Sequence, residues 1–366
     1  MEEWKKCKLG EFFELHRGYD LTKSEIKEGP YPVVCSTSIM GYHNEYKVKA
    51  PGVVIGRSGT LGEVQFIDTD YWPHNTSLYV SDFKGNSPKF IKYFLQLFGT
   101  GNVGGGSAVP TLNRNHLQAL TVRVPPLPTQ QKIAAILSSL DDKIELNNKI
   151  NTNLERQAQD LFKNWFVDKY EKEGTIGDYC AVKSGFAFKS AWWQDEGTKV
   201  IRIGDIEQGC LNLETCAHVA TDKIEVAKDF IVQGGDLVIA MTGATIGKFS
   251  MIPKTQEPIL VNQRVGKFFL GNNPIEKVPF IYCTLKQEEV ITEFINRGQG
   301  SAQPNISTGD ILSIPCWIPN KNEIDNFNKT IQPMFETIIS NQEENRKLSV
   351  LRDSLLPKLM NGEIEV

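Results

Sequence analysis

Residues 133–165, IAAILSSLDDKIELNNKINTNLERQAQDLFKNW, and residues 327–359, FNKTIQPMFETIISNQEENRKLSVLRDSLLPKL, carry the pattern that decides the fold. In each stretch the core positions recur at alternating steps of four and three residues, which is the seam of a coiled coil. The second seam lies 194 residues after the first. Two asparagines occupy matching seam positions in both stretches, namely Asn147 and Asn151 in the first and Asn341 and Asn345 in the second. This match indicates an internal duplication whose two long helices pair with each other.

The paired asparagines favour an antiparallel arrangement of the two helices. In an antiparallel pair, a positions pack against d positions, so Asn147 would meet Asn345 and Asn151 would meet Asn341. A polar seam residue lowers stability but specifies register, because a misaligned asparagine would face leucine and lose its hydrogen bond. Packing of each helix on its own head alone would not need so strict an alternation. We therefore expect an intramolecular antiparallel coiled coil roughly 48 Å long, with a head at each end.

The duplication extends into the regions that precede each helix. Residues 9–12 (LGEF) match residues 176–179 (IGDY), 167 positions later. Residues 106–110 (GSAVP) match residues 300–304 (GSAQP), 194 positions later. The second copy therefore carries extra loop residues between framework strands, and such insertions fall on protein surfaces, where binding differences arise.

The expected fold class is α+β, with two pseudo-repeated α/β heads separated by two long helices that form the coiled coil. We place head one at residues 1–127, the first long helix at 128–170, head two at 171–322 and the second long helix at 323–366. Short strands such as VVIG (53–56) and DLVIA (236–240) are predicted in both heads, and short helices are predicted at 88–98 and 276–296. Thr129 is the predicted N-cap of the first long helix.

The composition is that of a globular protein with room for two domains, at 366 residues, 40% hydrophobic and 23% charged. No apolar run approaches a membrane span, and the first residues do not form a secretion signal. The seven cysteines contain no CxxC pair, so we expect reduced thiols in the cytoplasm and no structural zinc site. The formal net charge is −4, so DNA binding would require local basic patches or charges from partner subunits.

Motifs for catalysis are incomplete. Residues 243–248 (GATIGK) have three residues between the glycines where a phosphate-binding loop has four, and Phe249 follows the lysine, so a tight turn is the better interpretation. Neither 273–275 (NPI) nor 124–127 (VPPL) forms an amino-methyltransferase motif. The five histidines show no metal-ligand or triad-like grouping. We expect a non-catalytic chain with no catalytic residue, no metal site and no cofactor of its own.

Residues 127–144 (LPTQQKIAAILSSLDDKI) closely resemble the central conserved region of type I restriction–modification specificity subunits, and residues 351–364 (LRDSLLPKLMNGEI) resemble that family's distal conserved region. The resemblance implies two target-recognition domains, each of which reads one half of a bipartite asymmetric site in double-stranded DNA, with the coiled coil setting the spacer. It also implies docking of two modification methyltransferase subunits and of restriction–translocation subunits. Those partners, rather than this chain, would carry S-adenosylmethionine, ATP and Mg²⁺.

Three other functions stay open at this point. Within the same class, the chain could instead be the specificity subunit of a related type II restriction enzyme, either two-subunit or fused. A duplicated protein-interaction scaffold would bind through its coiled coil and not through its heads. A self-sufficient methyltransferase would bind S-adenosylmethionine by itself, which the motifs above do not favour.

Candidate base-reading residues are polar and basic side chains, with their loop neighbours, at matching places in the two copies. In head one they are Arg17, Tyr19, Arg57, Ser58, Thr60, His74, Asn75, Thr76, Ser107 and Arg114. In head two they are Lys183, Lys189, Arg202, Asp205, Met241, Thr242, Asn262, Gln263, Arg264, Ser301 and Gln303. The alignment pairs 57–58 with 241–242 and 74–76 with 261–263. Similar backbone-shaping residues with different side chains are what two different half-sites would require.

Overall fold

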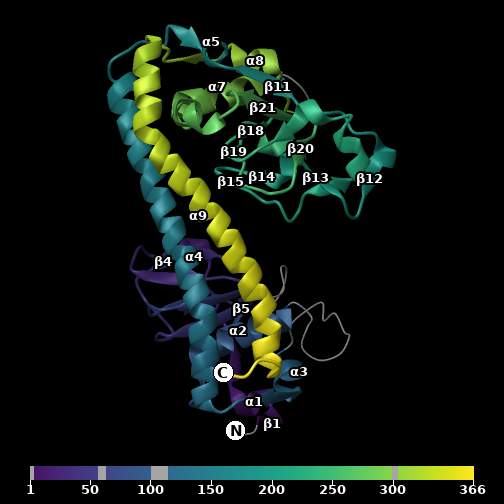
Figure 1. The fold of residues 1–366 in the computed structure, drawn as a ribbon. Helices are drawn as coiled ribbons and strands as arrows, with labels where there is room; N and C mark the ends of the chain where they lie inside the picture. Colours follow the sequence, from purple (N-terminus) through teal and green to yellow (C-terminus); the bar gives the residue numbers. More distant parts are fainter. Residues whose placement is uncertain (1–3, 57–62, 100–113, 299–303) are drawn as a thin grey trace. The chain divides into compact units, whose positions relative to one another are not determined.

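The computed structural model describes residues 4–56, 63–99, 114–298 and 304–366. The chain divides into two compact units: unit 1 comprises residues 1–144 and 347–366, and unit 2 comprises residues 145–346. The first long helix, α4 (Leu127–Phe162), and the second, α9 (Lys321–Asn361), each contribute to both units (Figure 1). The predicted α+β fold, with two similar heads and two long helices, is confirmed. Within the described residues, no helix is both long enough and apolar enough to cross a membrane.

Unit 1 contains head one. Its described elements are, in chain order, β1 (Lys5–Lys8), α1 (Leu9–Phe12), β2 (Glu14–Arg17), η1 (Lys23–Glu25), β3 (Tyr31–Val34), β4 (Ile39–His43), β5 (Gly52–Gly56), β6 (Val64–Ile67), β7 (Trp72–Pro73), β8 (Ser77–Asp82), α2 (Pro88–Gly99), α3 (Arg114–Ala119) and β9 (Thr121–Val124). They form an antiparallel sheet in the order β2-β8-β5-β6, a small mixed sheet in the order β4-β3-β7, and the pair β1-β9. Strand β5, GVVIG, is buried along its whole length because it has a neighbour on each side and α2 against one face.

Unit 2 contains head two. After the π-helical turn η2 (Lys163–Val167), its described elements are β10 (Gly174–Thr175), α5 (Ile176–Tyr179), β11 (Ala181–Ser184), η3 (Ser190–Trp192), β12 (Trp193–Gln194), β13 (Thr198–Ile201), η4 (Ile203–Asp205), β14 (Ile206–Glu207), β15 (Cys210–Leu211), β16 (Ala217–Val219), η5 (Thr221–Ile224), η6 (Lys228–Phe230), β17 (Ile231–Val232), β18 (Leu237–Ala240), η7 (Gly243–Thr245), β19 (Phe249–Met251), β20 (Ile259–Val261), β21 (Val265–Phe269), η8 (Pro274–Glu276), α6 (Val278–Leu285), α7 (Glu288–Gly298), α8 (Thr308–Leu312) and β22 (Pro315–Cys316). Its sheets have the orders β11-β21-β18-β19 and β12-β16-β13-β20-β17, with the pairs β10-β22 and β14-β15.

The strand orders show that the heads are copies of one another. The sheet β2-β8-β5-β6 corresponds to β11-β21-β18-β19, and the parallel pair β3-β7 corresponds to β13-β20. Val33 and Val200 occupy the same position in that parallel pair and are 167 residues apart in the sequence. Ile55 and Ile239 occupy the same position in the two four-stranded sheets and are 184 residues apart. Much of the extra sequence in unit 2 thus lies between β13 and β18, where the added hairpin β14-β15 is found.

The two long helices run antiparallel within unit 2. Asn147 Nδ2 donates to Asn345 Oδ1 at 2.9 Å, and Asn341 Nδ2 donates to Asn151 Oδ1 at 2.8 Å. Position numbers rise along α4 as they fall along α9, and the two helices lie side by side here (Figure 1). The hydrogen bonds join the same asparagine pairs that the seam pattern predicts. Each polar seam residue therefore shares one hydrogen bond with its counterpart, which lessens the cost of burying an amide, although Asn147 Oδ1 is buried without a partner among the described residues.

Within unit 1 the helices are joined by a different device, an ionic network around Asp141 of α4. Its Oδ2 accepts hydrogen bonds from Lys92 Nζ and from the Tyr93 hydroxyl, each at 2.6 Å, and its Oδ1 accepts one from Arg352 Nη1 of α9 at 2.8 Å. Arg352 occupies the seam position that Ala158 occupies in the first copy. The network therefore explains why an arginine interrupts the apolar pattern.

The helices pack on their own heads as well as on each other. In unit 1, Ile133 and Leu137 of α4 belong to the same buried cluster as Ile55 and Phe94 of head one. In unit 2, Phe162 is fully buried, and its ring lies 5.6 Å from that of Phe280 in α6. Contacts of α4 with the partner helix and with the head thus coexist. The seam pattern favours helix pairing over packing on the heads, and this prediction is incomplete. One face of a helix can pack on the partner helix while another face packs on the head.

Two predictions of local structure are wrong. Helix α4 begins at Leu127, so Thr129 lies inside its first turn and does not cap it. The buried side chain of Gln130 instead accepts a hydrogen bond from Ser87 N (3.1 Å) and donates to Pro125 O (2.9 Å). The helix expected at 276–296 is broken into α6 and α7, which are separated by Lys286 and Gln287. The predicted helix at 88–98 is confirmed as α2.

The asparagine register can be tested by crosslinking within unit 2. We predict that Asn147→Cys combined with Asn345→Cys forms a disulfide under mild oxidation, because these side chains are in direct contact. The misaligned pair, Asn147→Cys with Asn341→Cys, is the matched control and should crosslink much less. Gel mobility before and after reduction measures both, in a background where exposed Cys210 is serine. Equal yields from the two pairs would contradict the register.

Candidate nucleic-acid interface

The two units present equivalent strand ends. An isolated parallel bridge joins Tyr19 to His74 in unit 1, and the same bridge joins Phe186 to Asn262 in unit 2. Residues 74–76, which follow β7, are therefore equivalent to residues 262–264, which follow β20; these two segments are called the strand ends below. The predicted pairing of 74–76 with 261–263 is wrong by one residue. In a sequence alignment, a gap placed in a loop can move by one position without changing how well the residues match. The backbone bridge fixes the pairing, because it joins two defined residues in each copy.

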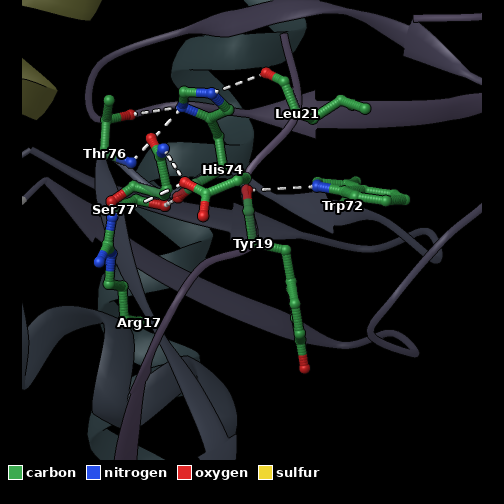
Figure 2. A network of polar contacts seen from close by, with 9 residues as sticks. Arg17, Tyr19, Leu21, Trp72, His74, Thr76 and Ser77 are labelled. Atoms are coloured by element: carbon green, nitrogen blue, oxygen red, sulfur yellow. Dashed lines mark hydrogen bonds and ion pairs between the residues drawn. The ribbon is translucent and has the colours of Figure 1, made fainter. Parts of the chain in front are cut away.

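In unit 1, His74 fastens the strand end to the neighbouring loop (Figure 2). Its Nε2 lies 3.1 Å from the carbonyl oxygen of Leu21, so this nitrogen carries the proton and donates. Its Nδ1 then accepts from the Thr76 hydroxyl at 3.0 Å and from Thr76 N at 3.4 Å. Both ring nitrogens have partners inside the protein. His74 is thus a residue that positions the strand end.

The side chains of Arg17, Asp20 and Asn75 form a second set of contacts beside His74, and the guanidinium of Arg17 stays exposed. Asn75 donates a short hydrogen bond to Asp20, and Arg17 Nη2 lies 3.7 Å from the same carboxylate. Arg17 Nε also donates to the carbonyl oxygen of Asn75 at 3.5 Å. The Arg17 side chain stays 58% exposed, so its guanidinium remains accessible to a phosphate or a base edge. The structure thus brings together Arg17, Tyr19, and the strand end at 74–76.

The side chain of Tyr19 is held in place by Tyr79. Its hydroxyl lies 3.1 Å from that of Tyr79, and its carbonyl oxygen accepts a hydrogen bond from the Trp72 indole at 3.5 Å. Burial raises the pKa of Tyr79 far above its usual range, and the hydrogen bond with Tyr19 raises it further. Tyr79 therefore stays protonated, and its hydroxyl holds the exposed side chain of Tyr19 in place.

A glycine precedes each bridge, and the backbone approach at both is too close for a side chain. A Cβ on Gly18 would lie 2.1 Å from the carbonyl oxygen of His74, and a Cβ on Gly185 would lie 2.2 Å from that of Val261. Both positions require glycine because another backbone segment approaches them closely, and not because their φ angles are unusual. The sequence match between these glycines reflects a shared packing need.

In unit 2 the strand end forms one wall of a pocket of about 630 Å³. Four predicted residues line it, namely Met241, Thr242, Gln263 and Arg264. Ile203, Gly243, Pro304 and Asn305 complete the lining. The pocket therefore gathers predicted residues from two separate loops and adds two further segments, at 203 and at 304–305.

Backbone hydrogen bonds tie the walls of this pocket together. Met241 N donates to Arg264 O at 3.0 Å, and Ile306 N donates to Met241 O at 2.9 Å. Gly243 N donates to Pro304 O at 2.9 Å. The three segments thus form a continuous, rigid frame, so the side chains that project from it are held at defined positions.

Comparison with known proteins identifies the family. The family model described as "Type I restriction modification DNA specificity domain" matches residues 1–156 and 168–351. The chain belongs to this family. The paired matches correspond to the two copies described above.

Curated relatives agree with this assignment, and a solved structure shares the fold. The chain is 28% identical over 289 residues to the type I restriction enzyme MjaIX specificity subunit of Methanocaldococcus jannaschii, an alignment that covers 72% of this chain and 65% of that protein. It is 25% identical over 334 residues to the HindI specificity subunit of Haemophilus influenzae, covering 70% and 71%. A crystal structure of a type I S subunit from M. genitalium shares the fold, with a TM-score of 0.61 and 19% identity over 98% of this chain and 96% of that one. The chain spans about two thirds of the length of the M. jannaschii relatives, 65% of one and 66% of the other.

Three further predicted residues of this specificity-domain protein, Arg202, Asp205 and Asn262, are described by the structure and do not line the pocket. Asp205 is 2% exposed, and its carboxylate accepts hydrogen bonds from Arg202 N (2.7 Å) and the Thr215 hydroxyl (3.0 Å). A base-reading role for Asp205 is therefore not supported, because it is buried and caps η4. Arg202 Nη2 donates to Thr215 O at 3.1 Å, and Asn262 Oδ1 accepts from Arg264 N at 3.3 Å. The first contact stabilises the loop and the second the strand end.

Lys183, Lys189 and Arg114 are not brought to either strand end by a contact in the structure. The ammonium of Lys183 lies 5.1 Å from the centre of the Phe269 ring, and that of Lys189 lies 5.6 Å from the Trp192 ring. Such cation–π contacts hold the side chains along the surface. Arg114 begins α3 and is partly buried.

Six predicted residues fall outside the described residues, namely Arg57, Ser58, Thr60, Ser107, Ser301 and Gln303. Four residues of the pocket lining were not predicted, namely Ile203, Gly243, Pro304 and Asn305. Asn305 could have been found, since it lies two positions after Gln303 in a stretch already singled out. Ile203 is apolar and carries no sequence signal for binding. Among the described residues, no three His, Cys, Asp or Glu side chains form a group that could hold a metal ion.

Proposed function

We propose that the chain is the DNA sequence-specificity subunit of a type I restriction–modification complex and that each unit reads one half of a bipartite asymmetric site. One observation carries the proposal: the strand ends share a backbone frame but display different side chains. The strand end of unit 1 consists of His74, which is bonded internally, Asn75 and Thr76, whereas that of unit 2 consists of Asn262, Gln263 and Arg264. A common frame with different hydrogen-bonding groups is suited to reading two different base sequences.

The two long helices are proposed to set the spacer between the half-sites and to provide docking surfaces for two modification methyltransferase subunits. In this division of labour, residues 1–127 and 171–322 form the recognition domains, and residues 128–170 and 323–366 form the coiled coil. Restriction–translocation subunits complete the full complex. The names of the relatives support the type of complex, since those proteins are specificity subunits of type I restriction enzymes.

We further propose that the chain itself is non-catalytic and acts in the cytoplasm, where its DNA target lies. The partner subunits would bind S-adenosylmethionine, ATP and Mg²⁺. The pocket of unit 2 supports a reading role, because its described lining contains two amides, a guanidinium and a hydroxyl, and no carboxylate or imidazole for acid–base chemistry.

The proposal is tested with the full chain in complex with its methyltransferase subunits. Selection from a library of randomised DNA duplexes should yield two short fixed blocks separated by a spacer of constant length. Methylome sequencing of the source organism, with and without the chain, should show methylation of that motif only in its presence. Binding without any selected motif, or a continuous motif without a spacer, would overturn the proposal.

The same experiment separates the alternative functions. A protein-interaction scaffold would bind partners through α4 and α9 and select no DNA. A type II specificity subunit would select a bipartite motif but would support cleavage at or near it without translocation. A self-sufficient methyltransferase would methylate DNA without any partner subunit.

A further inference from the structure

We propose that Arg264 reads a guanine in the half-site of unit 2 and that the pocket beside it receives the edge of that base pair. The inference rests on the proposed function and goes further by assigning one residue to the recognition of one base. It starts from the side chain of Arg264, for which the structure gives no internal role.

The guanidinium of Arg264 is exposed and available. Among the described residues, no hydrogen-bond acceptor or carboxylate contacts it, whereas Arg202 is bonded to Thr215 and Arg297 pairs with Glu293. The neighbouring Gln263 is exposed too, and its side chain has no partner among the described residues. Only the backbone of Arg264 is constrained, by its bond from Met241 N at 3.0 Å. A fixed backbone with a free guanidinium is suited to contacting a ligand.

The pocket also contains an unused polar atom. The hydroxyl of Thr242 is buried and has no hydrogen-bond partner among the described residues. Buried polar groups in proteins are nearly always paired, so an unpaired hydroxyl in a pocket wall indicates a partner from outside the chain. Asn305, which bridges to Thr242 across the pocket, adds an amide beside it. Polar groups thus surround the space in front of Arg264.

The guanidinium of Arg264 favours guanine over the other bases. Guanine presents two acceptors, O6 and N7, in the major groove, and a planar guanidinium donates to both. Cytosine presents an amino donor, for which a carboxylate would be the suitable partner, and the described residues that line the pocket include no carboxylate. The nearby Asp205 is buried and satisfied by Arg202 N and the Thr215 hydroxyl. The pocket therefore supplies donors where guanine has acceptors.

Unit 1 differs at the corresponding place. The residue equivalent to Arg264 is Thr76, whose hydroxyl is already paired with His74 Nδ1. A bidentate contact of this kind is therefore unique, within the two strand ends, to unit 2. Changing Arg264 should alter one half-site and leave the other as it was.

The test uses the full chain with its methyltransferase subunits and a randomised duplex library. With Arg264→Ala and with Arg264→Lys, discrimination in favour of one guanine in one half-site should fall by about 5- to 150-fold, the range for one bidentate base contact. The second variant keeps the charge, so its overall affinity should stay closer to that of the wild type. Lys228→Ala removes one exposed charge from the same unit and should leave the selected motif unchanged.

The outcomes separate this inference from the proposed function. If the wild-type complex selects no bipartite motif, the proposed function fails. If the wild type selects one and both Arg264 variants select the same motif with the same preference at every position, the inference is overturned. A loss of preference at a base other than guanine, or in both half-sites, also overturns it.

Discussion

Gly18→Ala is expected to destroy the strand end of unit 1, and Gly185→Ala that of unit 2. The added Cβ would lie 2.1 Å from His74 O in the first case and 2.2 Å from Val261 O in the second. The contacted atoms belong to the backbone, which cannot move aside, because Tyr19 N donates to Pro73 O at 2.8 Å on the same segment. We expect a loss of folding free energy on the order of 3 kcal/mol or more for the affected unit.

The two variants should also separate the half-sites. In duplex selection with the partner subunits, Gly18→Ala should lose the block read by unit 1 and Gly185→Ala the block read by unit 2. Gly41→Ala and Gly309→Ala are matched controls, since a Cβ there meets only side-chain atoms at 3.6 Å. Thermal unfolding measures stability in parallel. If Gly18→Ala has the same unfolding temperature as Gly41→Ala and still selects the full motif, the close contact between Gly18 and the backbone of His74 has no role.

The second large effect is expected at Asp141. Asp141→Asn should destabilise unit 1 by about 2–4 kcal/mol at neutral pH, because two cationic side chains lose their shared carboxylate in a partly buried place. The lost contacts are the hydrogen bonds from Lys92 and Arg352, at 2.6 and 2.8 Å. Asp142→Asn removes the same charge from an exposed neighbouring position and should change stability little.

The effect of Asp141 should depend on pH. Burial acts to raise the pKa of Asp141, but the hydrogen bonds from Lys92, Tyr93 and Arg352 outweigh it and hold the pKa below its usual value. The folded-state pKa is therefore lower than the unfolded one, which is about 3.9. The stabilisation is present above the unfolded pKa and is lost as pH falls through the folded pKa. Denaturant titrations should show the difference between wild type and Asp141→Asn shrinking below about pH 4, and a difference independent of pH would contradict the network.

Much of the architecture was predictable because it rests on periodicity. The four-three alternation predicted both helices and the pairing of Asn147 with Asn345, and the repeated glycines predicted two similar heads. Periodicity failed where one helix serves two partners. The seam pattern contains Leu161 but not Phe162, which is fully buried against the head.

The candidate site was predicted in part. Residues 74–76 and 262–264 were found in the sequence, apart from a one-residue error in their alignment. Side-chain roles were not predictable, since His74 and Asp205 look like base readers in sequence and are bound internally in the structure. Ile203 was missed because an apolar residue in a loop carries no signal of the pocket it lines.

By itself, the sequence determined that the chain is duplicated, that its helices pair antiparallel and where the heads begin to differ, because these properties follow from spacing along one chain. Only the tertiary structure decided which polar side chains are already satisfied and which remain available. Hydrogen-bond partners come from segments far apart in sequence, as Thr215 does for Asp205 and as Leu21 does for His74. Availability is therefore a property of the packed fold, and it is what distinguishes Arg264 from Arg202 and Arg297.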